Sequence, residues 1–182
     1  PTVLNKERKK LSKRHGDVSV GDFREKGYLP EGLVNYLALV GWTPESNKEL
    51  LTMDELIEEF SFERVANAGG IFDKDKLDWV NAHHIRNYDL DKLTQIAIPY
   101  LKEAGFIDDK FVEQRYDWLK TLVETVRENM PKVSEIVDKV GIFFDDKVDP
   151  ENEEALATLK GEEVPVVLNT LKEELEKIDE ID

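Results

Sequence analysis

Apolar side chains recur at three- and four-residue spacing over most of the chain, a pattern typical of amphipathic helices. Helix-start signals precede several of these stretches, such as Pro30 at a first helical position and Thr52 followed by Glu55 in a capping box. Spacing and caps together predict helices near residues 19–26, 30–41, 52–60, 73–86, 89–105, 109–130, 133–144, 150–159 and 164–178. Only residues 18–20 and 70–72 are candidates for strands, and both are very short.

The sequence therefore predicts a mainly α protein with at most very short β strands. The helix expected at 30–41 carries a broad apolar stripe made of Leu33, Val34, Leu37, Leu39 and Val40. The last helix carries a seam at three- and four-residue spacing, made of Leu168, Leu171, Leu175 and Ile178. That seam spans less than two heptads, so we expect an ordinary core face and not a coiled coil.

Composition excludes several classes of protein and site. The 182 residues include no cysteine and three histidines, which excludes disulfide scaffolds and thiolate metal sites. His83 and His84 are adjacent, so on a helix they point about 100° apart and cannot hold one ion together. No metal site is expected. No apolar run could span a membrane and no secretory signal is visible, so we expect a cytoplasmic monomer.

Charge is unevenly distributed along the chain. The net charge is −15, yet residues 1–15 carry six basic groups against one acid, a local charge of +5. Charges farther apart than about 8 Å are largely screened at physiological salt, so a local basic segment can bind phosphate on an acidic protein. The alternative is an acidic helical protein-interaction domain, or adaptor, with a solvated basic tail, and charge alone leaves both interpretations open.

The basic segment contains the sequence Lys10-Leu-Ser-Lys-Arg14, in which two lysines bracket a serine. Two ammonium groups at this spacing can point at one polyphosphate and neutralise charge that develops on a leaving pyrophosphate. The segment resembles the KMSKS signature of class I aminoacyl-tRNA synthetases. Residues 11–42 and 60–86 are similar to the blocks that follow this signature in bacterial glutamyl-tRNA synthetases. The resemblance is clear over about residues 1–145 and weak beyond them.

The resemblance implies a tRNA-binding, C-terminal part of such an enzyme. In that layout residues 1–18 hold the KMSKS-like loop and the end of the catalytic domain. Residues 19–88 form a helical stem-contact region, and residues 89–182 form the first α-helical anticodon-binding module. The intact enzyme would attach glutamate to its tRNA through a glutamyl-adenylate, using ATP with Mg²⁺. The pockets for ATP and glutamate would lie upstream, so we expect no catalysis from this chain alone and no bound cofactor.

Individual residues of the basic segment take their roles from the same resemblance. Lys13 matches the lysine that contacts ATP, and Ser12 and Arg14 complete the ATP-binding loop. Lys10 and Lys13 would be the catalytic residues, because their charges stabilise the departing pyrophosphate. Glutaminyl-tRNA synthetase is a related family whose anticodon region is implied to be largely β-barrel. The helical periodicity after residue 89 disfavours that family.

The expected tRNA-binding residues of the anticodon module are Arg127 and Asn129. Asn129 falls where discriminating members carry an arginine that reads the third anticodon base, and Arg127 lies two residues earlier. Members without that arginine also accept tRNA for glutamine, so the choice between tRNA for glutamate and tRNA for glutamine stays open. The alternative for Arg127 is a surface residue paired with an acid such as Glu124.

Overall fold

The computed structural model describes residues 2–11, 19–145 and 152–177. Contacts divide the chain into two compact units, Pro1–Phe144 and Asp145–Asp182. The predicted fold class is confirmed, because helices dominate both units. Among the described residues the strands are β1 (Val3–Leu4) and β2 (Gly70–Ile71).

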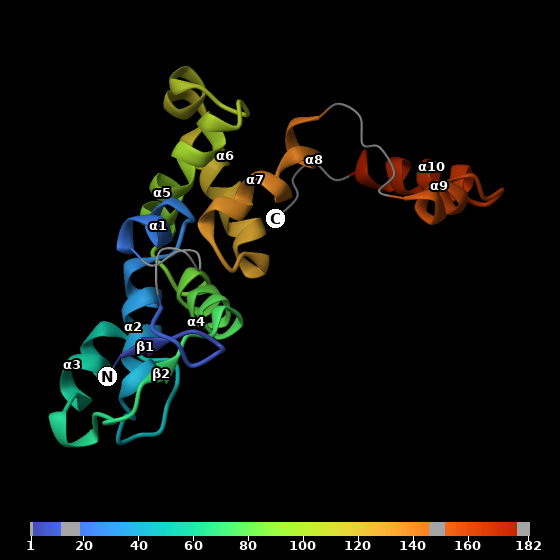
Figure 1. Ribbon diagram of the computed structural model, residues 1–182. Helices are drawn as coiled ribbons and strands as arrows, with labels where there is room; N and C mark the ends of the chain where they lie inside the picture. The colour runs from blue at the N-terminus through green and yellow to red at the C-terminus, as the bar shows by residue number, and fades with distance from the viewer. Residues whose placement is uncertain (1, 12–18, 146–151, 178–182) are drawn as a thin grey trace. The chain divides into compact units, whose positions relative to one another are not determined.

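The first part of the larger unit is built around a pair of packed helices. Its helical elements are α1 (Val20–Glu25), α2 (Pro30–Gly41), α3 (Met53–Glu59), the 3-10 turn η2 (Phe62–Arg64) and α4 (Lys74–Arg86). Figure 1 shows α2 beside α4, and buried Leu33, Tyr36, Leu77 and Val80 fill the space between them. The predicted caps are confirmed: Ser19 and Thr52 each head a capping box in which side chain and backbone exchange hydrogen bonds.

The second part of this unit continues in helices. They are α5 (Leu90–Glu103), α6 (Asp109–Val126), the 3-10 turns η3 (Arg127–Asn129) and η4 (Val133–Glu135), α7 (Ile136–Lys139) and α8 (Gly141–Phe144). The predicted single helix over 109–130 is wrong in detail. Arg115 has non-helical angles (φ −134°, ψ 33°) inside α6, and the α-helix ends at Val126. The helix expected over 133–144 is three short turns, which together bury Val133, Ile136 and Val140.

Backbone hydrogen bonds join the two parts at one junction. The amide of Val133 donates to the carbonyl of Gly27 at 2.9 Å. The Ser134 hydroxyl donates to the Lys26 carbonyl at 2.8 Å. Gly27 has φ +81°, and a Cβ there would lie 2.5 Å from the Ser134 nitrogen. The position requires glycine, both for its left-handed backbone and for this close approach.

The two strands form a small parallel sheet in which Val3 pairs with Gly70 and Leu4 with Ile71. The strand expected at 70–72 is therefore confirmed at Gly70–Ile71, whereas β1 was not foreseen. The strand expected at 18–20 is wrong where the structure describes it, because Ser19 caps α1 and residue 20 begins it. Residue 18 lies outside the described residues.

Two predicted apolar faces are corrected by the observed exposure. In the smaller unit, α9 (Glu153–Leu159) and α10 (Val164–Leu175) bury no residue, and the seam members Leu168, Leu171 and Leu175 are 52%, 52% and 44% exposed. The seam is therefore not a core face among the described residues, and its last predicted member, Ile178, lies outside them. Spacing alone identified the stripe, but residues 152–177, the part of this unit that the structure describes, do not bury it.

The stripe predicted on α2 is too broad. Val34 and Leu37 are exposed, while the buried face also contains Gly32 and Asn35. Asn35 is buried because it is satisfied: its amide donates to the Glu49 carbonyl and accepts from the Leu51 amide, both at 3.1 Å. A polar residue with such partners can occupy a core position that hydropathy assigns to the surface.

Candidate nucleic-acid interface

The basic N-terminal loop, residues 5–10, leaves β1 and returns to it. Lys10 forms an antiparallel bridge with Leu4, which closes the loop. Inside the loop the Asn5 side chain accepts hydrogen bonds from two backbone amides, including that of Lys9 at 2.9 Å. Lys10 is exposed. Lys10, one of the two predicted catalytic lysines, therefore lies at the exposed end of a folded loop.

The other predicted residues of this site lie next to that loop in sequence. Ser12, Lys13 and Arg14 fall outside the described residues, so their roles stay predictions. The last described position before them is fixed, because the Leu11 amide donates to the Val3 carbonyl at 3.0 Å.

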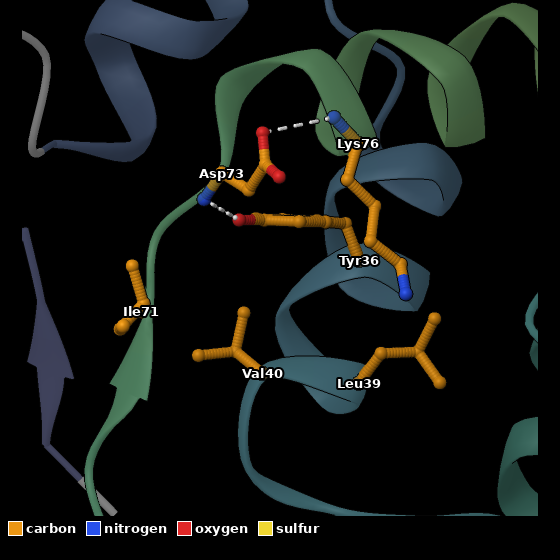
Figure 2. A pocket seen from close by; sticks show the side chains of 6 residues that line it. All are labelled: Tyr36, Leu39, Val40, Ile71, Asp73 and Lys76. Carbon is orange, nitrogen blue, oxygen red and sulfur yellow. Dashed lines mark hydrogen bonds between the residues drawn. The ribbon is translucent and has the colours of Figure 1, made fainter. Parts of the chain in front are cut away.

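The small sheet connects the basic loop to the start of α4. β2 runs directly into Asp73, the N-cap of α4, whose carboxylate accepts from the Asp75 amide at 3.0 Å. The Tyr36 hydroxyl in turn accepts from the Asp73 amide at 2.6 Å (Figure 2). Burial raises the pKa of Tyr36, so the hydroxyl stays protonated at neutral pH.

A pocket of about 280 Å³ lies at this corner. Figure 2 shows its lining, in which Leu39 and Val40 of α2 lie below the Tyr36 ring and Ile71 of β2 closes one side. Lys76 completes the lining, and its ammonium pairs with Glu49 at 2.5 Å. Of the predicted site residues that the structure describes, Lys10, Arg127 and Asn129 do not line this pocket.

One side of α4 carries an aromatic and basic face, which we call the α4 face: exposed Trp79 with partly covered His83 and Arg86. Their spacing of four and three residues puts them on one side of the helix. Trp79 is 45% exposed, although large aromatic rings are usually covered. The sequence analysis missed Trp79. Its place on the polar side of α4, opposite buried Leu77 and Val80, is the signal that identifies it.

The two histidines of α4 are both partly covered but have different neighbours. His84 is half-buried, and its Nε2 lies 3.0 Å from the Asn35 side-chain oxygen. Burial lowers the pKa of His84, and the neighbouring His83 lowers it further, although Glu31 acts in the opposite direction. His84 is therefore neutral at pH 7 and belongs to the packing between α2 and α4, whereas His83 stays on the α4 face.

The predicted anticodon residues lie on a turn that follows α6, residues 127–130, which we call the reader turn. Arg127 is largely covered, with 18% of its side chain exposed, and pairs with Glu124 at 2.8 Å. Its Nη1 also donates to the Tyr88 carbonyl at 3.3 Å. The pairing with Glu124 that the alternative interpretation expected is present, but Arg127 is largely covered and is not the surface residue of that interpretation. Asn129 is exposed at the last position of η3.

The described residues lack two other kinds of feature. Across residues 2–11, 19–145 and 152–177, no group of three or more histidine, aspartate or glutamate side chains could hold a metal ion. Within the same ranges, no helix combines the length and apolar character needed to cross a membrane.

The chain matches two known families, one before and one after residues 80–91. Residues 1–79 match the family described as tRNA synthetases class I (E and Q), catalytic domain. Residues 92–182, half of the chain, match the family described as anticodon binding domain. The chain belongs to the anticodon-binding domain family. Both Arg127 and Asn129 lie inside the part that matches this family, whereas Trp79 is the last residue of the catalytic-domain match.

Relatives of this anticodon-binding domain chain are glutamate–tRNA ligases. That of Clostridioides difficile is 51% identical over 97% of the chain, and that of Alkaliphilus metalliredigens is 50% identical over 100%. The chain spans 36% and 37% of the length of these two relatives. The chain is also similar to a crystal structure of the glutamate–tRNA ligase from Elizabethkingia meningosepticum in complex with its amino acid. The alignment covers 98% of this chain and 38% of the ligase chain, with TM-score 0.76 and 26% identity.

Proposed function

We propose that this chain is the tRNA-docking part of a glutamate–tRNA ligase, an enzyme that attaches glutamate to its tRNA with ATP through a glutamyl-adenylate. The observation that carries the proposal is the match of half of the chain to the anticodon-binding family, together with alignment of 97–100% of the chain to ligases at 50–51% identity. Under this proposal residues 1–18 belong to the KMSKS-like loop, 19–88 contact the tRNA stem, and 89–182 form the first anticodon module. The interval between the two family matches, 80–91, includes the proposed boundary at 88–89.

The α4 face supplies the chemistry for a stem contact. An A-form RNA helix presents a wide, shallow minor groove with ribose hydroxyls, which proteins recognise by shape and by sugar and phosphate contacts. Trp79 offers an exposed apolar ring that can pack on riboses, and His83 offers a ring N–H that can donate to a 2′-hydroxyl. Contact through riboses explains how a chain of net charge −15 can bind a polyanion.

The reader turn supplies the contact with the anticodon. Asn129 is exposed and carries a side chain that both donates and accepts, which suits a base edge in an unpaired loop. The covered guanidinium of Arg127 supports a different role, because its Nη1 and Nη2 already donate to the Tyr88 carbonyl and to Glu124. Asn129 is therefore the proposed base contact, and Arg127 holds the turn.

The basic loop fits ATP by the chemistry of its donors. Exposed Lys10 stands on a loop that also carries Lys6 and Arg8, and cationic side chains of this kind bind polyphosphate. Lys10, Ser12, Lys13 and Arg14 would hold the ATP phosphates with Mg²⁺, and bound ATP supplies the adenylate leaving group. Lys10 and Lys13 would neutralise the charge that develops on the pyrophosphate as it departs.

The test is a titration of the 182-residue chain with three tRNAs: those for glutamate and glutamine and an unrelated one, at two salt concentrations. The expected result is salt-dependent binding that favours tRNA for glutamate over the unrelated tRNA. Whether tRNA for glutamine binds equally decides the open question of tRNA choice. Equal weak binding to all three tRNAs would support the adaptor interpretation and overturn the proposal.

A matched pair of variants tests the α4 face. Trp79→Ala is expected to weaken binding by about tenfold, because a partly exposed ring covered by RNA contributes on the order of 1–2 kcal/mol. Phe62→Ala is the control, since Phe62 is also an exposed aromatic (82%) but stands beside Glu63. Equal effects of the two variants would remove the α4 face from the proposal.

A further inference from the structure

The reader turn is held from outside by α4. The Arg86 Nη1 donates to the carbonyl of Glu128, next to Asn129, at 3.2 Å. Further along, the buried Asn81 amide donates to the Pro131 carbonyl at 2.6 Å. Two side chains of α4 thus bind the backbone on either side of the exposed tip of the turn.

A second arginine binds in the opposite direction. Arg127, which belongs to the turn, donates to the carbonyl of Tyr88, just after the end of α4. The Glu124 carboxylate orients the same guanidinium at 2.8 Å. Each segment therefore holds the other by a guanidinium on a backbone carbonyl, and we call this reciprocal pair the arginine clamp: Arg86 and Arg127.

We propose that Arg86 is a positioning residue for anticodon binding, acting through the Glu128 carbonyl to fix the direction in which Asn129 points. The inference rests on the proposed function, because it takes Asn129 as the RNA contact. Arg86 lies on the α4 face with Trp79 and His83, so its guanidinium could be assigned to phosphate instead. The hydrogen bond to Glu128 favours positioning, since a donor aimed at a carbonyl beside Asn129 restricts the turn before RNA arrives.

The two roles predict different responses to salt and to a second substitution. An arginine on phosphate contributes to the number of released counterions, so its removal lowers the slope of log affinity against log salt by about one. A positioning arginine leaves that slope unchanged. Its effect also disappears when the group that it positions is already gone, so the two substitutions are non-additive.

The experiment is a double-mutant cycle in the 182-residue chain with Arg86→Met and Asn129→Ala. Affinity is measured for an RNA hairpin that carries the anticodon stem and loop of tRNA for glutamate. Arg86→Met keeps the length of the side chain and removes the donor. Arg86→Lys restores a donor and is expected to recover most of the affinity. Lys110→Met, at an exposed position on α6, controls for the loss of one positive charge.

Each single substitution is expected to weaken binding by about fivefold to tenfold, the effect of losing one base contact. The double variant should bind no more than about twofold weaker than Asn129→Ala, with the salt slope of Arg86→Met unchanged. Additive losses with a lower slope would overturn the inference in favour of a phosphate contact. Failure of Asn129→Ala to weaken binding would overturn it as well. If the unsubstituted chain binds the hairpin no better than an unrelated one, the proposed function itself fails.

Discussion

A comparison of alanine substitutions at Gly27 and Gly105 tests how closely the two parts of the larger unit pack at their junction. Both follow the ends of helices, and their φ angles are nearly identical at +81° and +80°. A Cβ at Gly27 would lie 2.5 Å from the Ser134 nitrogen, whereas one at Gly105 would meet no atom within 4 Å. Alanine at either position therefore costs the same backbone strain, and only Gly27 adds a collision.

The expected loss of stability follows from these two contributions. A non-glycine residue in the left-handed region costs about 1–2 kcal/mol, which is the whole effect expected for Gly105→Ala. Forcing a methyl group into a packed site costs about 1–3 kcal/mol more. For Gly27→Ala the two contributions add, so the free energy of unfolding should fall by about 2–5 kcal/mol, with the upper part of this range expected because the collision is with backbone, which cannot rotate away.

Urea unfolding followed by tryptophan fluorescence measures this difference, because all three tryptophans lie in the larger unit. A midpoint shift for Gly27→Ala at least twice that for Gly105→Ala is the expected result. Equal shifts for the two variants would refute the view that the junction is closely packed at residue 27.

Three other substitutions or conditions test separate features. Asn81→Leu should lower the free energy of unfolding by about 2–5 kcal/mol, measured by urea denaturation, because two buried backbone partners lose their hydrogen bonds. Gly70→Ala should destabilise the β1–β2 pairing, seen as faster amide exchange there, since its Cβ would lie 1.9 Å from the Val40 carbonyl oxygen. The backbone amide of Thr52 holds the pKa of Glu55 at about 2, below its ordinary 4.5. The stabilisation of α3 should therefore be complete above pH 4.5 and lost as the pH falls toward 2, and a side-chain NMR titration of Glu55 that gives an ordinary pKa would contradict it.

Local signals in the sequence predicted the helices well, because caps and breakers act over three or four residues. The capping boxes at Ser19 and Thr52 and the stop at Gly27 depend only on neighbours in the chain. β1 was not predicted, because its two residues pair with a segment nearly 70 positions away and no local sequence pattern indicates such pairing. The same limit applied to α10, since spacing identifies an apolar stripe but not a partner that buries it.

The candidate site was predictable to a smaller extent, for the same reason. The resemblance singled out Lys10 and Asn129, and both are exposed, Lys10 at the end of the basic loop and Asn129 on the reader turn. The contribution of Arg86 depends on a carbonyl 42 positions away, which only the fold brings within reach. Trp79 is the exception, because its place on the polar side of an amphipathic helix was visible in the sequence and was overlooked.

The parallel pairing of β1 with β2 has a mechanical consequence. Among the described residues, hydrogen bonds join the first strand to the segment that leads into α4, including Gly70 to the Thr2 carbonyl (3.1 Å) and Phe72 to the Leu4 carbonyl (2.7 Å), and these bonds carry tension applied before residue 2. By contrast, α2 and α4 are held together by a cluster of buried apolar side chains. Under load, the segment that carries Lys10 would detach as one piece and leave the helices folded behind it.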